Sequence, residues 1–164
     1  MQAFSSLDFY LKSQKMKESM IITEEVQFKA PAEKVWDLIT NPAMTKKYMF
    51  GCELVSDWKI GSPVLWKGKT EDGQEMIYVK GEVLEYEVGK KVVSTTFDPH
   101  AGMADIPENY VKLSYEVESR GEGSLLRIIQ GDFSSGENAK KRYEESREGW
   151  KAMVIPMMKE LLGE

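Results

Sequence analysis

The sequence contains one cysteine, Cys52, and one histidine, His100, and this scarcity excludes several kinds of site. A single thiol cannot form an internal disulfide or a cysteine-rich zinc site, which suits a reducing compartment. A nucleophilic cysteine needs a base nearby, whereas His100 lies far away in the sequence. Asp98, His100 and Asp105 are spaced too loosely to predict a metal centre. Since the sequence also has no glycine-rich nucleotide fingerprint, we expect neither a metal nor a cofactor.

Positive charge and long apolar runs are also lacking. The 22 Lys and Arg residues are outnumbered by 27 Asp and Glu residues, and the net charge is −5. The longest basic cluster, residues 140–142, is followed by Glu144 and Glu145, which is typical of a solvated helix face. We therefore expect no nucleic-acid partner. No apolar run approaches the about 18 residues of a membrane helix and no secretory signal is recognisable, so we expect no membrane insertion and a cytoplasmic location.

The chain does contain enough apolar sequence for one substantial core. Hydrophobic residues make up 41% of its 164 residues. A chain of this length buries about 70% of its surface on folding. We expect a single domain over residues 20–164, which forms a monomer or a homodimer. Residues 1–19 are interpreted as an N-terminal extension, either a short helix or disordered, with Phe4, Leu7 and Leu11 at helical spacing.

Alternating apolar residues and turn signals predict a sheet of six to seven antiparallel strands. We expect strands over residues 21–28, 54–58, 64–69, 75–86, 92–97, 110–117 and 124–131. Asp72-Gly73 predicts a hairpin turn, and Gly81 inside a strand predicts a bulge or a close approach of the backbone. One or two short helices are expected within residues 31–48, where Pro31 suits the first turn of a helix.

A long C-terminal helix is predicted over residues 138–162. Its apolar stripe consists of Tyr143, Trp150, Met153, Val154, Met157 and Leu161. Pro156 lies inside this pattern and removes one backbone hydrogen bond, so we expect a kink near Ala152 and Met153. This order of elements predicts an α+β protein, in which a curved sheet wraps around one long helix. A cavity is expected where the sheet and the helix do not meet fully.

Four segments resemble a known superfamily when they are taken in order. They are residues 26–42 (VQFKAPAEKVWDLITNP), 61–66 (GSPVLW), 81–86 (GEVLEY) and 148–153 (EGWKAM). The order resembles the START-like, or SRPBCC, helix-grip fold over about residues 20–162. More narrowly, it is similar to the family of the C-terminal domain of the activator of the heat-shock-protein-90 ATPase. The resemblance implies a helix-grip fold, but it says less about activity, because one fold carries many kinds of site.

We expect the ligand-binding residues to come from the faces that enclose the cavity, together with the loop that carries His100. The candidates are Trp36, Trp58, Trp66, Met76, Tyr78, His100, Tyr115, Trp150, Met153, Val154 and Met157. Methionine and tryptophan suit a cavity that accepts irregular apolar ligands. Plain core packing is the alternative explanation for each of these residues taken singly.

These features favour a non-catalytic protein that binds a small hydrophobic molecule, such as a lipid, an isoprenoid or an aromatic polyketide-like compound. Burying about 300 Å² of apolar ligand contributes about 7 kcal/mol. Association costs at least about 4 kcal/mol, so tight binding needs a polar ligand group that Tyr78, Tyr110 or Tyr115 could bond. Two alternatives stay open: a chaperone-cofactor-type module that binds a chaperone or another protein, and a cyclase- or hydrolase-like enzyme that uses the same cavity.

Overall fold

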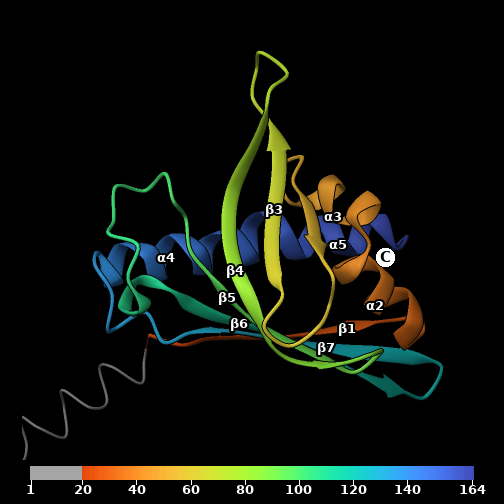
Figure 1. Ribbon diagram of the computed structural model, residues 1–164. Helices are drawn as coiled ribbons and strands as arrows, with labels where there is room; N and C mark the ends of the chain where they lie inside the picture. Colours follow the sequence, from red (N-terminus) through yellow and green to blue (C-terminus); the bar gives the residue numbers. More distant parts are fainter. Residues whose placement is uncertain (1–19) are drawn as a thin grey trace, which may run out of the picture.

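The computed structural model describes residues 20–164, in which a curved antiparallel sheet wraps around a long C-terminal helix (Figure 1). The strands are β1 (Ile22–Phe28), β2 (Glu53–Ser56), β3 (Pro63–Lys69), β4 (Glu75–Glu87), β5 (Lys91–Thr96), β6 (Val111–Arg120) and β7 (Gly123–Gly131). The helical segments are α2 (Ala32–Thr40), α3 (Pro42–Tyr48), a 3₁₀ turn (Pro107–Asn109), α4 (Ala139–Gly149), a π-helical turn (Trp150–Val154) and α5 (Ile155–Leu161). The predicted α+β helix-grip fold is confirmed. The expected N-terminal extension lies outside the described residues.

The sheet has the strand order β1-β7-β6-β5-β4-β3-β2. Strands β2 to β7 each lie beside their neighbours in the sequence, whereas β1 pairs with the last strand, β7. In this register, Gln130 of β7 lies opposite Ile22 on one side and Leu113 on the other. Because side chains that lie directly opposite each other point to the same face of a sheet, these three residues share the concave face.

Bulges and one glycine allow the sheet to curve. The pairing register shifts between Trp66 and Lys67 and again between Val83 and Glu85. A Cβ atom at Gly81 would lie 1.7 Å from the backbone oxygen of Thr95. The predicted close approach at Gly81 is therefore present, and bulges of this kind bend the strand that carries them.

The core lies between the concave face of the sheet and the helices. Helix α2 buries Val35, Leu38 and Ile39, which are 1% exposed or less. Helices α2 and α3 lie near one end of the C-terminal helix, beside α5 (Figure 1). The C-terminal helix buries a set of residues spaced four apart: Trp150, Val154 and Met158.

The C-terminal helix continues past Pro156 because its backbone bonding changes in the preceding turn. The amide of Ile155 donates to the carbonyl oxygen of Trp150, five residues back, as in a π helix. The sequence predicted an interruption near Ala152 and Met153, and the structure places the π-helical turn there. None of the helices within residues 20–164 has the length and apolar character needed to span a lipid bilayer.

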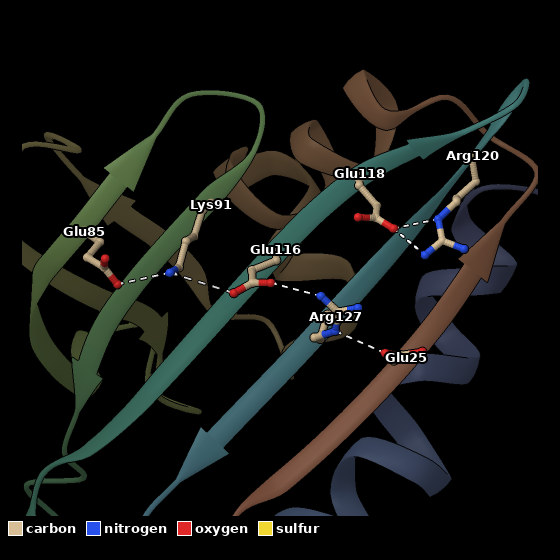
Figure 2. Close-up of polar contacts among 7 residues, drawn as sticks. All are labelled: Glu25, Glu85, Lys91, Glu116, Glu118, Arg120 and Arg127. Carbon is tan, nitrogen blue, oxygen red and sulfur yellow. Dashed lines mark hydrogen bonds and ion pairs between the residues drawn. The ribbon is translucent and has the colours of Figure 1, made fainter.

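The outer, convex face of the sheet carries a row of alternating charges (Figure 2). Lys91 lies 3.3 Å from Glu85 and 3.8 Å from Glu116. Arg127 then bridges Glu116 and Glu25, at 3.1 Å from each. This charge ladder joins β4, β5, β6, β7 and β1, so it spans much of the sheet on the side away from the helix.

Candidate functional site

A cavity of about 820 Å³ lies between the concave face of the sheet and the C-terminal helix. Its inner wall is apolar, with Trp66, Val79 and Leu113 from the sheet and Trp150 and Val154 from the π-helical turn. All five are buried or half-buried. This volume falls within the range of about 300–1,000 Å³ that is typical of small-molecule sites.

The rim of the cavity is charged, and its charges balance. The rim residues are Asp98, Lys141, Arg142 and Glu145, from the loop after β5 and from α4. Lys141 and Glu145 lie 4.0 Å apart and are both exposed. The loop and α4 thus supply two acidic and two basic groups, and the wall that faces them is apolar.

Arg142 is the least exposed charge of the rim. Its Nη2 donates to the carbonyl oxygen of Asn109 at 2.9 Å, and its guanidinium lies 5.8 Å from the ring centre of Phe133. Partial burial lowers the pKa of Arg142 from its usual value. The Nη1 atom is buried and has no hydrogen-bond partner within the described part of the chain.

The sheet contributes three polar side chains to the cavity lining, Tyr78, Thr96 and Gln130, and Asn138 and Ser146 line it from the start of α4 and from α4 itself. The hydroxyl of Thr96 donates to the carbonyl oxygen of Val111 at 2.9 Å. The indole N–H of Trp150 donates to Oε1 of Gln130 at 2.8 Å. The cavity therefore combines aromatic and aliphatic contacts with a small number of directed hydrogen-bonding groups.

The loop that carries part of the rim, residues 98–110, is attached to the rest of the molecule at two places. Asn109 is buried, accepts a hydrogen bond from the backbone amide of Glu137 at 2.9 Å and donates to the carboxylate of the same residue at 3.0 Å. On its other side, Asp105 pairs with Lys80 of β4 at 2.6 Å and accepts from the hydroxyl of Tyr110 at 2.7 Å. These contacts fix the loop between β4 and the start of α4.

Five of the eleven candidate residues from the sequence line the cavity: Trp66, Tyr78, Trp150, Met153 and Val154. The alternation in β3 and β4 and the helical stripe place them on facing surfaces. Their position in the wall is a finding of the structure, and their role in binding a ligand is part of the proposal below.

The structure places the other six candidates outside the cavity lining. Trp36 and Trp58 flank Tyr86, with ring centres 5.8 and 5.7 Å from it, and Trp58 lies beyond β2 at a positive φ of 56° rather than in a strand. Tyr115 packs behind Trp150 at 6.2 Å. It is buried and its hydroxyl has no partner among residues 20–164, and desolvation raises its pKa.

The remaining three candidates lie at the surface or near it. His100 is exposed, and its Nε2 lies 2.9 Å from the carbonyl oxygen of Ile77. Its ring meets the ring of Tyr78 edge-on at 6.3 Å, so it lies next to a cavity residue without lining the cavity itself. Met157 is 39% exposed on α5, and Met76 is half-buried on β4.

Several lining residues were not among the candidates, including Cys52, Phe97, Met103, Gln130 and Phe133. Cys52 is half-buried, and desolvation raises the pKa of its thiol, so the neutral form is favoured. One signal could have identified Gln130, because it follows Leu126 and Ile128 at a spacing of two and so points inward with them. The loop residues gave no comparable periodic signal.

Comparison with known proteins identifies relatives of this chain. Residues 29–163 match the family model described as Activator of Hsp90 ATPase homolog 1-like protein. No curated protein matches the chain.

Solved structures show the same fold. A protein from Cytophaga hutchinsonii is 31% identical, with a TM-score of 0.67, over 86% of this chain and 92% of that one. An HSP90 activator from Plasmodium falciparum is 16% identical, with a TM-score of 0.64, over 87% and 96% of the two chains. CalU16 from Micromonospora echinospora is 15% identical, with a TM-score of 0.64, over 87% and 75%. The family match spans most of the sequence, so the chain belongs to the family of Activator of Hsp90 ATPase homolog 1-like proteins, within the START-like superfamily.

Proposed function

We propose that this protein binds a small hydrophobic molecule, such as a lipid, an isoprenoid or an aromatic polyketide-like compound, without chemically changing it. The observation that supports this proposal is the cavity of about 820 Å³, which has an apolar inner wall and lies under the C-terminal helix. Its wall includes the buried aromatic side chains Trp66 and Trp150. Methionines at Met49, Met103 and Met153 add flexible apolar surface that can adapt to ligands of different shapes.

Tryptophan fluorescence offers a direct test, because two of the four tryptophans line the cavity and two do not. The full-length protein would be titrated with a panel of fatty acids, isoprenoids and aromatic polyketides. We expect ligands to change the emission of Trp66 and Trp150. Replacing either of these residues by phenylalanine should reduce the ligand-dependent signal, whereas the matched variants Trp36→Phe and Trp58→Phe should retain it.

The proposal would be wrong if no compound of the panel changed the fluorescence or the thermal midpoint of the protein. It would also be wrong if the signal depended on Trp36 and Trp58 alone, since these two residues pack around Tyr86 outside the cavity lining.

Binding to a chaperone is the second candidate function. The family is named for an activator of Hsp90, and apolar side chains are exposed near the cavity: Phe50 is 71% exposed and Met153 is 46% exposed. A protein-interaction module of this kind predicts that Phe50→Ser weakens capture of the cognate Hsp90. Because Phe50 also lines the cavity, ligand binding by this variant is measured separately. Absence of capture by the unmodified protein would argue against this function.

Catalysis in the same cavity receives less support from the geometry. The two carboxylates that border the cavity, Asp98 and Glu145, are exposed at the rim rather than held in the apolar wall. His100 lies outside the cavity lining, with one ring nitrogen at hydrogen-bonding distance from a backbone carbonyl. A general acid or base must reach the reacting atoms of a bound substrate. If the protein were a cyclase- or hydrolase-like enzyme that uses His100, His100→Ala would abolish turnover.

A further inference from the structure

Gln130 is a polar residue at an otherwise apolar position of the sheet. It follows Leu126 and Ile128 on the inward face of β7, and both of these residues are fully buried. Its neighbours across the sheet are Ile22 and Leu113, which are also buried. An amide in such surroundings is costly unless its hydrogen-bonding groups are satisfied, so its presence calls for a partner.

Trp150 determines the orientation of this amide. The indole N–H can only donate a hydrogen bond, so the atom 2.8 Å away that receives it must be the oxygen Oε1 of Gln130. The nitrogen Nε2, with its two hydrogens, therefore points elsewhere. Because Trp150 is only 5% exposed and packs edge-on against Tyr115, it holds the amide in one orientation.

The NH₂ group of Gln130 is left without a protein acceptor among residues 20–164. Within this part of the chain, the only fully buried side-chain polar atoms that lack a partner are Tyr115 Oη and Arg142 Nη1. Nε2 of Gln130 is not one of them, and it makes no hydrogen bond to residues 20–164; the side chain as a whole is half-buried. Gln130 lines the cavity, so its side chain borders the space that a ligand would occupy.

The charges around the cavity restrict what could bind to this donor. The charged lining residues belong to the rim: Asp98, Lys141 and Glu145 are exposed. Arg142 donates to the Asn109 carbonyl through Nη2, and its other terminal nitrogen, Nη1, is buried away from accessible space. The inner wall itself contains no charged residue. A carboxylate or an ammonium group placed in the wall would be a buried charge without a counter-charge, which is strongly unfavourable. An uncharged oxygen acceptor meets no such penalty.

We propose that the ligand carries an uncharged carbonyl oxygen, as in a ketone, quinone, aldehyde or ester, which accepts a hydrogen bond from Nε2 of Gln130. Gln130 is then the residue that selects this class of ligand, and Trp150 is a positioning residue that keeps the NH₂ group directed at it. This inference rests on the proposed function and specifies the ligand chemistry of the same cavity. It also supplies the directed polar contact that an apolar cavity needs for tight binding.

Two compounds of nearly identical shape test the proposal. Benzophenone carries a carbonyl group where 1,1-diphenylethylene carries a carbon–carbon double bond. We expect the full-length protein to bind benzophenone about three- to tenfold more tightly, as measured by calorimetry, because one added hydrogen bond has an effect of this size. In Gln130→Met this ratio should fall to about one, and in Trp150→Phe it should fall part of the way. Gln74→Met, a matched change at an exposed position, should leave the ratio unchanged.

The ratio of the two affinities is insensitive to a general loss of stability, because both compounds depend on the same folded cavity. A second readout is the side-chain amide signal of Gln130 in ¹H–¹⁵N NMR spectra, which should shift with benzophenone and much less with 1,1-diphenylethylene. Diphenylacetate, which carries a carboxylate, should bind more weakly than benzophenone.

Three outcomes would overturn the inference and leave the proposed function intact: equal affinities for the two compounds, a ratio that survives in Gln130→Met, or tighter binding of diphenylacetate. Binding of neither compound would instead count against hydrophobic ligand binding itself, and so against both proposals.

Discussion

Two glycines show that the effect of adding a Cβ atom depends on the space around the residue. Gly81 lies in β4, where a Cβ would lie 1.7 Å from the carbonyl oxygen of Thr95 on β5. Gly149 lies at the end of α4 with helical dihedral angles, and a Cβ there would have no atom within 4 Å. The first glycine is required by close backbone contact between strands, whereas the second only adds flexibility to the unfolded chain.

The same substitution should therefore have opposite effects at the two positions. Gly81→Ala forces β4 and β5 apart and should lower the free energy of unfolding by about 1–3 kcal/mol or more. Gly149→Ala should raise it by about 0.5–1 kcal/mol. Denaturant unfolding of both variants measures these changes. A Gly81→Ala variant as stable as the unmodified protein would contradict the close approach of the two strands.

Asp105 makes stability depend on pH. The hydrogen bonds from Lys80, and then from Tyr110, hold the pKa of its carboxyl below the usual value. Because this pKa is lower in the folded than in the unfolded chain, the stabilisation is complete above the ordinary aspartate value of about 4. It is lost as the pH falls through the lowered value.

We therefore expect Asp105→Asn to lower the thermal midpoint at pH 7 and to have less effect at pH 2–3, below the ordinary aspartate pKa, because the stabilisation declines as the carboxyl takes up a proton. Asp57→Asn is the matched control, since Asp57 is exposed and has no side-chain hydrogen bond within residues 20–164. Equal effects of Asp105→Asn at both pH values would show that the contact with Lys80 and Tyr110 contributes no pH-dependent stability.

At the scale of single elements, the C-terminal helix combines an interruption with a continuous buried stripe. The π-helical turn allows Ile155 to bond five residues back, so the helix does not depend on the amide that Pro156 lacks. Trp150, Val154 and Met158 all stay buried across this turn. The turn also supplies Trp150, Met153 and Val154 to the cavity, so the irregular part of the helix forms its apolar wall, whereas α4 supplies rim residues.

Replacing Pro156 should consequently change stability little. A proline in a regular helix interior costs about 3 kcal/mol, but here the π-helical turn has already redirected the affected bonds. We expect Pro156→Ala to change the free energy of unfolding by less than about 1 kcal/mol. If denaturant unfolding showed that Pro156→Ala raises the free energy of unfolding by about 3 kcal/mol, Pro156 would be straining the helix.

At the scale of the whole molecule, the two faces of the sheet carry different kinds of side chain. The concave face contributes the cavity wall and the core, whereas the convex face carries the charge ladder from Glu85 to Glu25 (Figure 2). Arg127 is central to the ladder, because it contacts one carboxylate on β6 and another on β1. It thereby links the edge strand β1 to the middle of the sheet.

Arg127→Gln should lower the thermal midpoint at low ionic strength, and the difference should shrink as salt is added, because salt screens exposed charges. Arg120→Gln is the matched control, since Arg120 pairs only with Glu118 of its own strand among residues 20–164. We expect it to have a smaller effect. Equal shifts in the two variants would show that bridging between strands adds nothing to an ordinary surface ion pair.

Much of the architecture follows from periodicity and turn chemistry along the chain. The strand segments alternate with a spacing of two, Gly81 marks the close approach, and the stripe around Trp150 identifies the C-terminal helix. These sequence patterns predicted the residues of the candidate site less well than the fold. All four tryptophans were candidates for the cavity, but Trp36 and Trp58 pack around Tyr86 outside it.

The sequence by itself determined the α+β class, the order of the elements and the inward faces of the strands, and its single cysteine excludes a disulfide within this sequence. All of these depend on residues close together in the chain or on composition. Only the tertiary structure decided which inward residues face a cavity and which face each other. That choice depends on the curvature of the sheet and on the distance to the helix. The contact between Trp150 and Gln130, which joins the helix to β7, illustrates this, since no local pattern specifies how two distant elements are spaced.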